Sequence, residues 1–329
     1  MLATMDVPAA LSALAPRLSP GAATALNARR LSGGASLETW AFDLDDGAAL
    51  ILRRRPPSAL MSDTALPLAT EAVLLAAVRP RGAPVPEVVH VCAPEDGLGE
   101  AYLMRRLEGE TLGKRIVRDE AFAGVRPGLA RRCGEVLAAI HATPLEGLPP
   151  LATSDAANEL QRYEAVYRDL RPQRPIFEAA FRWLESRAPP LERPVLVHGD
   201  FRNGNLMIHP ASGLVGVLDW ELAHLGDPAE DLGWICVNSW RFGQWRRPVG
   251  GFGDYQDLLD GHAAAGGGAV SLERLLFWQA LGSLKWGVMC LMMYASFASG
   301  ADRSIERAMI GRRASEAEID LVLLMERLG

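Results

Sequence analysis

The spacing of apolar residues divides the chain into a strand-rich first third and a helix-rich remainder. In the first third, apolar and polar positions alternate in four segments, residues 37–42, 49–53, 88–92 and 100–104. A two-residue period is typical of β strands with one buried face. Asp45, Asp46 and Gly47 separate the first two segments and predict a hairpin turn. We therefore predict a small antiparallel sheet, preceded by an alanine-rich helical segment at residues 8–30 that is broken at Pro16 and Pro20.

Beyond residue 105, apolar residues recur at helical spacing. The segments with this pattern are residues 126–141, 158–168, 176–187 and 272–297, and the stretch after Ser315. Ser315 and Glu318 form a capping box that predicts the start of the last helix. The whole pattern predicts an α+β chain with a small N-terminal sheet lobe, residues 1–105, and a larger, mainly helical lobe, residues 106–329.

Residues 194–221 interrupt the helical pattern with the order strand, loop, strand, turn, strand. The parts are the apolar run 195–197, the polar loop HGDFRNGN at 198–205, the apolar run 206–208, a turn at 210–213 and the apolar run 214–218. This order predicts that Asp200, Asn205 and Asp219 lie close together. Turn formation alone would explain Asn203 and Gly204, but it does not explain a carboxylate at the end of an apolar strand.

The sequence HGDFRNGN followed by VLDWE resembles the aminoglycoside phosphotransferase, or choline-kinase-like, family of small-molecule kinases. It is most similar to the branch that includes kinase domains fused to acyl-CoA dehydrogenases. The resemblance implies a bilobal, protein-kinase-like fold. It also implies transfer of a γ-phosphate from ATP, or GTP, to a hydroxyl group of a small molecule. The implied ligands are the nucleotide, Mg²⁺ and this acceptor.

The resemblance assigns roles to individual residues around the catalytic loop. Asp200 would accept the proton of the acceptor hydroxyl, and Arg202 would lie near the transferred phosphate. Asn205 and Asp219 would hold Mg²⁺ through amide and carboxylate oxygens. The residues expected to support the shape of the loop are His198 and Asp231.

The resemblance also implies a nucleotide site between the two lobes. Arg53 stands on the strand where most kinases carry Lys, and Glu71 on the next helix would pair with it. The planar guanidinium suits phosphate, so we interpret Arg53 as a variant of the usual cation, whereas Arg54 and Arg55 are predicted to be solvated. The turn expected to cover the phosphates contains Ser32, Gly33, Gly34 and Ser36. The residues expected to contact the nucleotide base are Met104, Arg105 and Leu107.

Composition and charge exclude several other classes. The net charge of −6 and the pI near 5.6 argue against a nucleic-acid partner, which usually requires a basic face. The 4 cysteines are widely spaced and predict neither a zinc site nor a disulfide framework. The most apolar stretch, residues 286–298, is shorter than the ~20 residues of a membrane span, and no signal peptide is apparent. We therefore expect a cytoplasmic protein without a membrane partner, and the oligomeric state stays open.

Three function classes are compatible with these residues. A small-molecule kinase is favoured because Asp200, Asn205 and Asp219 are all present. A nucleotide-binding pseudokinase or regulatory module is indicated only by Arg53. A metal-dependent hydrolase would need more carboxylates or histidines near the site than the sequence places there.

The nature of the acceptor is suggested by a single loop. Residues 239–248 contain three arginines and three large aromatic residues, but no acid. A polycationic aminoglycoside would instead require carboxylates, although an antibiotic kinase and a solvated surface loop remain alternatives. We therefore hypothesise that the acceptor is a hydroxylated acid or an acyl thioester. The residues expected near its acidic end are Arg241, Arg246 and Arg247.

Overall fold

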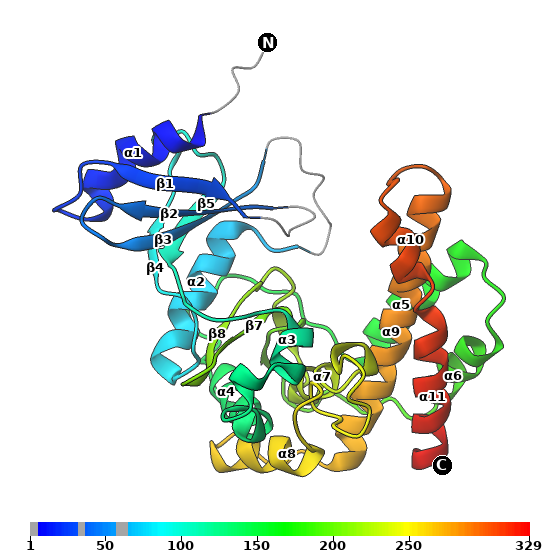
Figure 1. The fold of residues 1–329 in the computed structure, drawn as a ribbon. Coiled ribbons are helices and arrows are strands. Elements are labelled where there is room, and N and C mark those ends of the chain that lie inside the picture. Colours follow the sequence, from blue (N-terminus) through cyan, green and yellow to red (C-terminus); the bar gives the residue numbers. More distant parts are fainter. Residues whose placement is uncertain (1–5, 32–36, 57–64) are drawn as a thin grey trace.

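The computed structural model describes residues 6–31, 37–56 and 65–329 (Figure 1). Its N-terminal part is built on a five-stranded antiparallel sheet with the order β1-β2-β3-β5-β4. The strands are β1 (Ala25–Arg30), β2 (Glu38–Leu44), β3 (Ala49–Arg54), β4 (Val88–Val91) and β5 (Ala101–Arg105). The predicted antiparallel sheet is confirmed, including the hairpin turn, in which Gly47 has a φ of 92° that favours glycine.

The segment 8–30 is helical only as far as Leu18, before the predicted break at Pro20. The predicted break at Pro16 and the helix at residues 25–30 were wrong. Helix α1 (Val7–Leu18) begins after Asp6, whose Oδ1 accepts a hydrogen bond from the backbone N–H of Ala9 (3.1 Å). Strand β1 follows and pairs with β2 along one edge of the sheet. This pairing joins residues that are distant in sequence, and it outweighs the local helix preference of an alanine-rich segment.

Two helices cover the two faces of the sheet, with α1 on one side and α2 (Leu68–Val78) on the other (Figure 1). Leu11 and Leu14 of α1 belong to the same apolar core as Leu50 and Leu52 of β3. Side chains alternate along a strand, so Arg53 points to the opposite face, which α2 covers. The sheet thereby directs Arg53 toward the helix that carries its predicted partner.

Arg54 and Arg55 do not form the solvated basic run that the sequence suggested. Their side chains are only 5% and 9% exposed. Arg54 lies 3.7 Å from a carboxylate oxygen of Glu38, and Arg55 lies 2.8 Å from one of Glu100. Strand β3 lies between β2 and β5, so the end of this strand is enclosed by neighbours that supply acids.

The remainder of the chain is mainly helical, which confirms the predicted α+β class. The helices are α3 (Gly113–Arg118), α4 (Leu129–His141), α5 (Ala156–Leu170), α6 (Pro175–Glu185), α7 (Pro228–Trp234), α8 (Tyr255–Ala264), α9 (Leu272–Ala298), α10 (Ile305–Gly311) and α11 (Ala314–Leu328). The sequence did not indicate α8 or α10. The last helix begins one residue before Ser315, with Arg313 at the cap position, so the predicted capping box is not formed.

Helix α9 is the central element of the helical part. It is 27 residues long, and by length and composition alone it could cross a membrane. Within this protein, however, 78% of its most apolar 18-residue window is buried, and α5, α6, α7, α10 and α11 pack against it (Figure 1). The prediction that residues 286–298 form a core helix is correct only for the start of this stretch, because burial ends at Cys290 and both Met292 and Tyr294 are exposed.

Four short strands carry the segment that resembles a catalytic loop. They are β6 (Val195–Val197), β7 (Leu206–His209), β8 (Gly213–Val217) and β9 (His224–Gly226). Strands β7 and β8 form the predicted hairpin, whereas β6 pairs with β9. Two backbone hydrogen bonds join this segment to the N-terminal part, from Val217 N–H to the Pro84 carbonyl (2.7 Å) and from Leu66 N–H to the Glu221 carbonyl (2.8 Å).

Candidate active site

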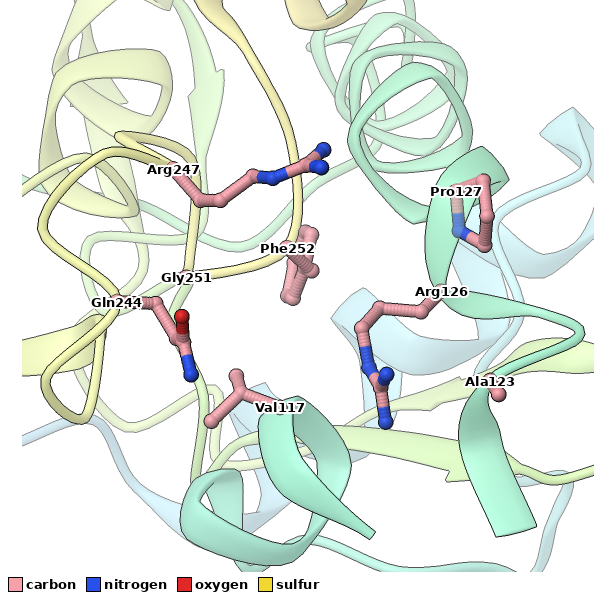
Figure 2. A pocket seen from close by; sticks show the side chains of 8 residues that line it. All are labelled: Val117, Ala123, Arg126, Pro127, Gln244, Arg247, Gly251 and Phe252. Carbon is pink, nitrogen blue, oxygen red and sulfur yellow. The ribbon is translucent and has the colours of Figure 1, made fainter. Parts of the chain in front are cut away.

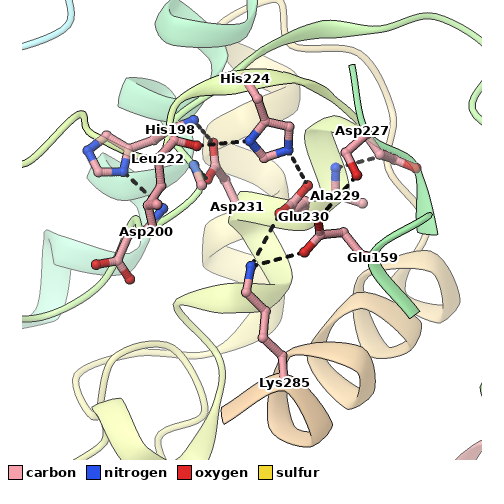
Figure 3. A network of polar contacts seen from close by, with 12 residues as sticks. Glu159, His198, Asp200, Leu222, His224, Asp227, Ala229, Glu230, Asp231 and Lys285 are labelled. Atoms are coloured by element: carbon pink, nitrogen blue, oxygen red, sulfur yellow. Dashed lines mark hydrogen bonds and ion pairs between the residues drawn. The ribbon is translucent and has the colours of Figure 1, made fainter. Parts of the chain in front are cut away.

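The loop between β6 and β7 is held in shape by one buried carboxylate. Asp231 on α7 accepts backbone hydrogen bonds from His198 N–H (2.8 Å) and Gly199 N–H (2.9 Å), and it contacts His141 Nε2 at 3.2 Å (Figure 3). Burial alone would raise the pKa of Asp231, but the hydrogen bond with His141 and the nearby histidine charges hold it below its usual value. Asp231 is therefore a charged acceptor at the base of the loop.

Gly199 is required by the same geometry. Its φ of 77° lies in the left-handed region, and an added Cβ would come within 2.4 Å of the Leu222 carbonyl oxygen. His198 contacts the Leu218 carbonyl through Nε2 (3.0 Å). The loop therefore packs directly on the strand that leads to Asp219.

Three side chains fix the carboxylate of Asp200. Its Oδ1 accepts hydrogen bonds from Arg202 Nε (2.8 Å) and from Trp234 Nε1 (2.7 Å). Its Oδ2 accepts one from Asn205 Nδ2 (2.7 Å). Trp234 was not predicted from the sequence, because no motif spacing connects the end of α7 with the loop.

Trp234 is buried beside a cluster of charged residues, of which Figure 3 shows Glu159, Glu230 and Lys285. Lys285 Nζ lies 5.2 Å from the centre of the Trp234 ring and 3.3 Å from Glu159 Oε2. Glu230 lies 3.9 Å from the same ammonium group and 3.1 Å from His224 Nε2. Burial would lower the pKa of His224, but Glu230 raises it to about 9. The cluster was not predicted from the sequence. The signal that could have indicated it is Lys285, a lysine within a largely apolar helix.

Replacing Trp234 by phenylalanine is expected to lower kcat about tenfold and to leave the KM for nucleotide unchanged. The substitution removes a hydrogen bond to a carboxylate, which is worth roughly 1.5–3 kcal/mol. Steady-state kinetics would measure both constants, with Trp183→Phe on α6 as the matched control. Equal kcat values for the two variants would show that Trp234 does not position Asp200.

Asn205 and Asp219 lie side by side. The Leu218 N–H donates to the Asn205 carbonyl (2.8 Å), and Asp219 follows directly with a φ of 67°. The Asn205 amide nitrogen donates to Asp200, which leaves its Oδ1 as the atom that can bind a metal. An amide oxygen and a carboxylate are the donor types that Mg²⁺ prefers, so these residues fit a magnesium site.

Arg53 links this site to the sheet and to α2. Its guanidinium Nη2 contacts the Asp219 carboxylate, and its Nε lies 3.2 Å from Glu71 Oε2. Tyr102 Oη donates to the same Glu71 oxygen (3.3 Å). Burial raises the pKa of Glu71 to about 7, with Arg53 opposing and Asp219 and Glu221 adding to the rise. The predicted pairing of Arg53 with Glu71 is present in the structure.

A cavity of about 280 Å³ lies between the sheet and the β7–β8 hairpin. Four predicted site residues line it: Arg53, Met104, Asn205 and Asp219. Arg105 and Leu107 do not line it. Arg105 is exposed, and its N–H donates to the Glu87 carbonyl (2.8 Å). The predicted phosphate-covering residues Ser32, Gly33, Gly34 and Ser36 lie outside the described residues.

The three arginines proposed for the acceptor differ in their environments. Arg241 is 7% exposed and donates to the Cys236 carbonyl from Nε (3.1 Å) and Nη2 (2.6 Å), so it is committed to the backbone and does not reach a pocket. Arg246 is exposed and stacks at 4.6 Å over the ring of Trp245. Arg247 lines a second pocket (Figure 2). The structure therefore does not support the prediction for Arg241.

Comparison with known sequences identifies one family. The model of the phosphotransferase enzyme family matches residues 27–267. Acyl-CoA dehydrogenase family member 11 of Gallus gallus is 27% identical over 333 residues, which cover 91% of this chain and 41% of that protein. Acyl-CoA dehydrogenase family member 10 of Mus musculus is 30% identical over 215 residues, which cover 62% of this chain and 20% of that protein. The chain thus spans less than half the length of these relatives.

Solved structures share the fold over almost the whole chain. A putative aminoglycoside phosphotransferase from Ralstonia eutropha superposes with a TM-score of 0.74 at 21% identity, covering 97% of this chain and 98% of that one. A choline/ethanolamine kinase family protein from Mesorhizobium loti superposes with a TM-score of 0.65 at 22% identity, covering 98% and 95%. The predicted protein-kinase-like fold is therefore confirmed.

Proposed function

Because the chain belongs to the phosphotransferase enzyme family, as its motifs implied, we propose that it is a small-molecule kinase. It transfers the γ-phosphate of ATP, or GTP, to a hydroxyl group and requires Mg²⁺. The observation that carries this proposal is the convergence of four residues from three segments on one site. Asn205 bonds to Asp200 and lines the same cavity as Asp219 and Arg53.

Each of these residues has a distinct part in the proposed reaction. Asp200, oriented by Asn205 and Trp234, accepts the proton of the acceptor hydroxyl through Oδ1 or Oδ2. Arg53, held by Glu71, binds phosphate oxygens of the nucleotide, and Arg202 lies where it can offset charge on the transferred group. Mg²⁺, held by Asn205 and Asp219, supplies charge neutralisation on the phosphates when bound.

Consumption of Mg-ATP in the presence of candidate acceptors tests the proposal. A pool of hydroxy acids and hydroxyacyl thioesters should stimulate ADP release above the rate with ATP alone. Stabilisation of the protein by nucleotide in thermal denaturation, without turnover on any hydroxyl compound, would instead favour a regulatory nucleotide-binding module. Phosphate release from phosphoesters without ATP would indicate a hydrolase.

The acceptor in this proposal is an acid or an acyl thioester and not an aminoglycoside. The support is the loop of residues 239–248, which contributes Arg246 and Arg247 at the surface and no carboxylate. One relative by fold, an aminoglycoside phosphotransferase, was solved with AMP-PNP and hygromycin B, but it is only 16% identical to this chain. Phosphorylation of kanamycin-type amines with high kcat/KM would contradict this choice of acceptor.

Replacing Arg53 by alanine is expected to raise the KM for ATP and to lower kcat. The combined loss in kcat/KM should be roughly 10- to 100-fold, as for a hydrogen bond to a charged group. Arg55→Ala is the matched control, because Arg55 pairs with Glu100 and does not line the cavity. Equal losses in both variants would show that positive charge in general, and not the position of Arg53, is what the nucleotide requires.

A further inference from the structure

The loop that follows α7 forms one wall of a second pocket, about 340 Å³ in volume (Figure 2). Gln244, Arg247 and Phe252 belong to this loop. Val117 at the end of α3 and Arg126 in the turn before α4 belong to the opposite wall. The two walls are distant in sequence, so the sequence did not indicate the pocket.

The pocket carries two positive charges that the described part of the chain does not neutralise. Arg126 donates to backbone carbonyls, from Nε to Ile116 (3.0 Å) and from Nη2 to Asp119 (2.6 Å). These bonds fix the guanidinium but do not offset its charge. Within residues 6–31, 37–56 and 65–329, no carboxylate forms an ion pair with Arg126 or Arg247, and none lines the pocket.

Between the two arginines the pocket is bordered by buried side chains that expose little apolar surface. Phe252 is 1% exposed and Val117 is 4% exposed, and both side chains border the space between the two arginines (Figure 2). Gln244 adds an amide that can donate or accept a hydrogen bond. A pocket of this kind suits an anion, because a guanidinium can bind carboxylate or phosphate through two hydrogen bonds.

The same loop is fastened to the catalytic loop. Asn203 Nδ2 donates to the carbonyls of Trp240 (2.9 Å) and Gly250 (2.6 Å). Phe242 packs closely against Gly113, where an added Cβ would lie 2.2 Å from the Phe242 ring and 2.8 Å from Asn203 Cβ. The loop that carries Arg247 is thus hydrogen-bonded to Asn203, which lies between Asp200 and Asn205 in the sequence of the catalytic loop.

We propose that this pocket binds the anionic end of an organic acceptor, with Arg247 and Arg126 contacting a carboxylate or phosphate group. The inference rests on the proposed kinase function, because it assigns the pocket to the acceptor of that reaction. Of the three arginines that the sequence predicted near the acceptor, the inference keeps only Arg247, and it adds Arg126. Arg241 is committed to the backbone and Arg246 to the Trp245 ring.

Direct binding of phenyl phosphate tests the site without any turnover. The probe joins an anion to a flat apolar ring, and saturating Mg-ADP in every sample keeps it out of the nucleotide cavity. Isothermal titration calorimetry at low salt should give a Kd for Arg247→Gln at least tenfold weaker than for the unmodified protein. Arg246→Gln, which changes a neighbouring exposed cation outside the pocket, should leave the Kd unchanged.

Two results would overturn the site. One is an equal loss of affinity in Arg246→Gln and Arg247→Gln, which would indicate diffuse surface charge. The other is an unchanged Kd for phenyl phosphate in Arg247→Gln. Arg247 is exposed, so its replacement is expected to leave the fold intact, which circular dichroism would verify.

The acceptor role has its own measurement. Once an acidic acceptor is found, Arg247→Gln should raise its KM at least tenfold and leave the KM for ATP unchanged. An unchanged acceptor KM, with normal kinase turnover, would overturn the acceptor role while the kinase function stands. A different result is also possible, in which phenyl phosphate binding depends on Arg247 but the protein transfers no phosphate. This result would overturn both the kinase function and the acceptor role, and the pocket would then be an anion site only.

Discussion

Replacing Asp200 by alanine is expected to lower kcat by about 10²- to 10⁴-fold, the usual contribution of a positioned general base. Hydrogen bonds from Arg202, Trp234 and Asn205 fix the carboxylate of Asp200. Among the described residues, no other carboxylate accepts these three hydrogen bonds. The affinity for Mg-nucleotide should change little, because Asp200 does not line the cavity that contains Arg53 and Asp219. Single-turnover kinetics and nucleotide titrations would measure the two effects separately.

Asp254→Ala provides the matched control for this experiment. Asp254 is an exposed residue before α8, and its side chain makes no capping hydrogen bond. Its replacement should leave kcat and nucleotide affinity unchanged. If Asp200→Ala retained turnover close to that of this control with an efficient acceptor, Asp200 would not be the base.

Replacing Asp219 by alanine is expected to abolish the dependence of nucleotide affinity on Mg²⁺. The variant loses the only carboxylate of the described cavity lining, and kcat/KM should fall by about 10²-fold or more, since metal-ion charge stabilisation is worth several kcal/mol. Arg53 would also lose its contact with Asp219, which frees the guanidinium for phosphate. Metal-free nucleotide should therefore bind the variant at least as tightly as it binds the unmodified protein.

Titration of AMP-PNP with and without Mg²⁺ checks this expectation. In the unmodified protein, Mg²⁺ should tighten binding, whereas in Asp219→Ala the two Kd values should coincide. Glu221→Gln is a suitable control, because Glu221 lies 3.9 Å from Arg53 but does not line the cavity. A normal Mg²⁺ response in Asp219→Ala would remove Asp219 from the metal site.

The sequence predicted the parts of the site that are local in the chain. Asp200, Asn205 and Asp219 belong to one strand-loop-hairpin segment, so their spacing alone predicted that they lie close together. The pairing of Arg53 on β3 with Glu71 on α2 was implied by the resemblance to kinases. Only the first prediction followed from a short stretch of chain; the second required a known family pattern.

The features that the sequence did not predict all depend on distant packing. Trp234 reaches Asp200 only because α7 lies next to the catalytic loop, and Arg126 and Arg247 line one pocket only because the turn before α4 and the 241–252 loop are neighbours. The strand character of residues 25–30 depends on pairing with β2, and the burial of Arg54 depends on Glu38 of that strand. Local propensity carries no information about such contacts.

The length and apolar character of helix α9 affect the chain while it is still being synthesised. Its most apolar window has a mean hydropathy of 1.3, and its burial depends partly on α11, where Asp320 bonds to Ser283 and Ala317 packs near Gly287. During synthesis α9 is complete before α11 exists, so the nascent chain for a time presents a segment that resembles a membrane anchor. Substitutions that loosen α11 should therefore expose apolar surface of α9 and favour aggregation.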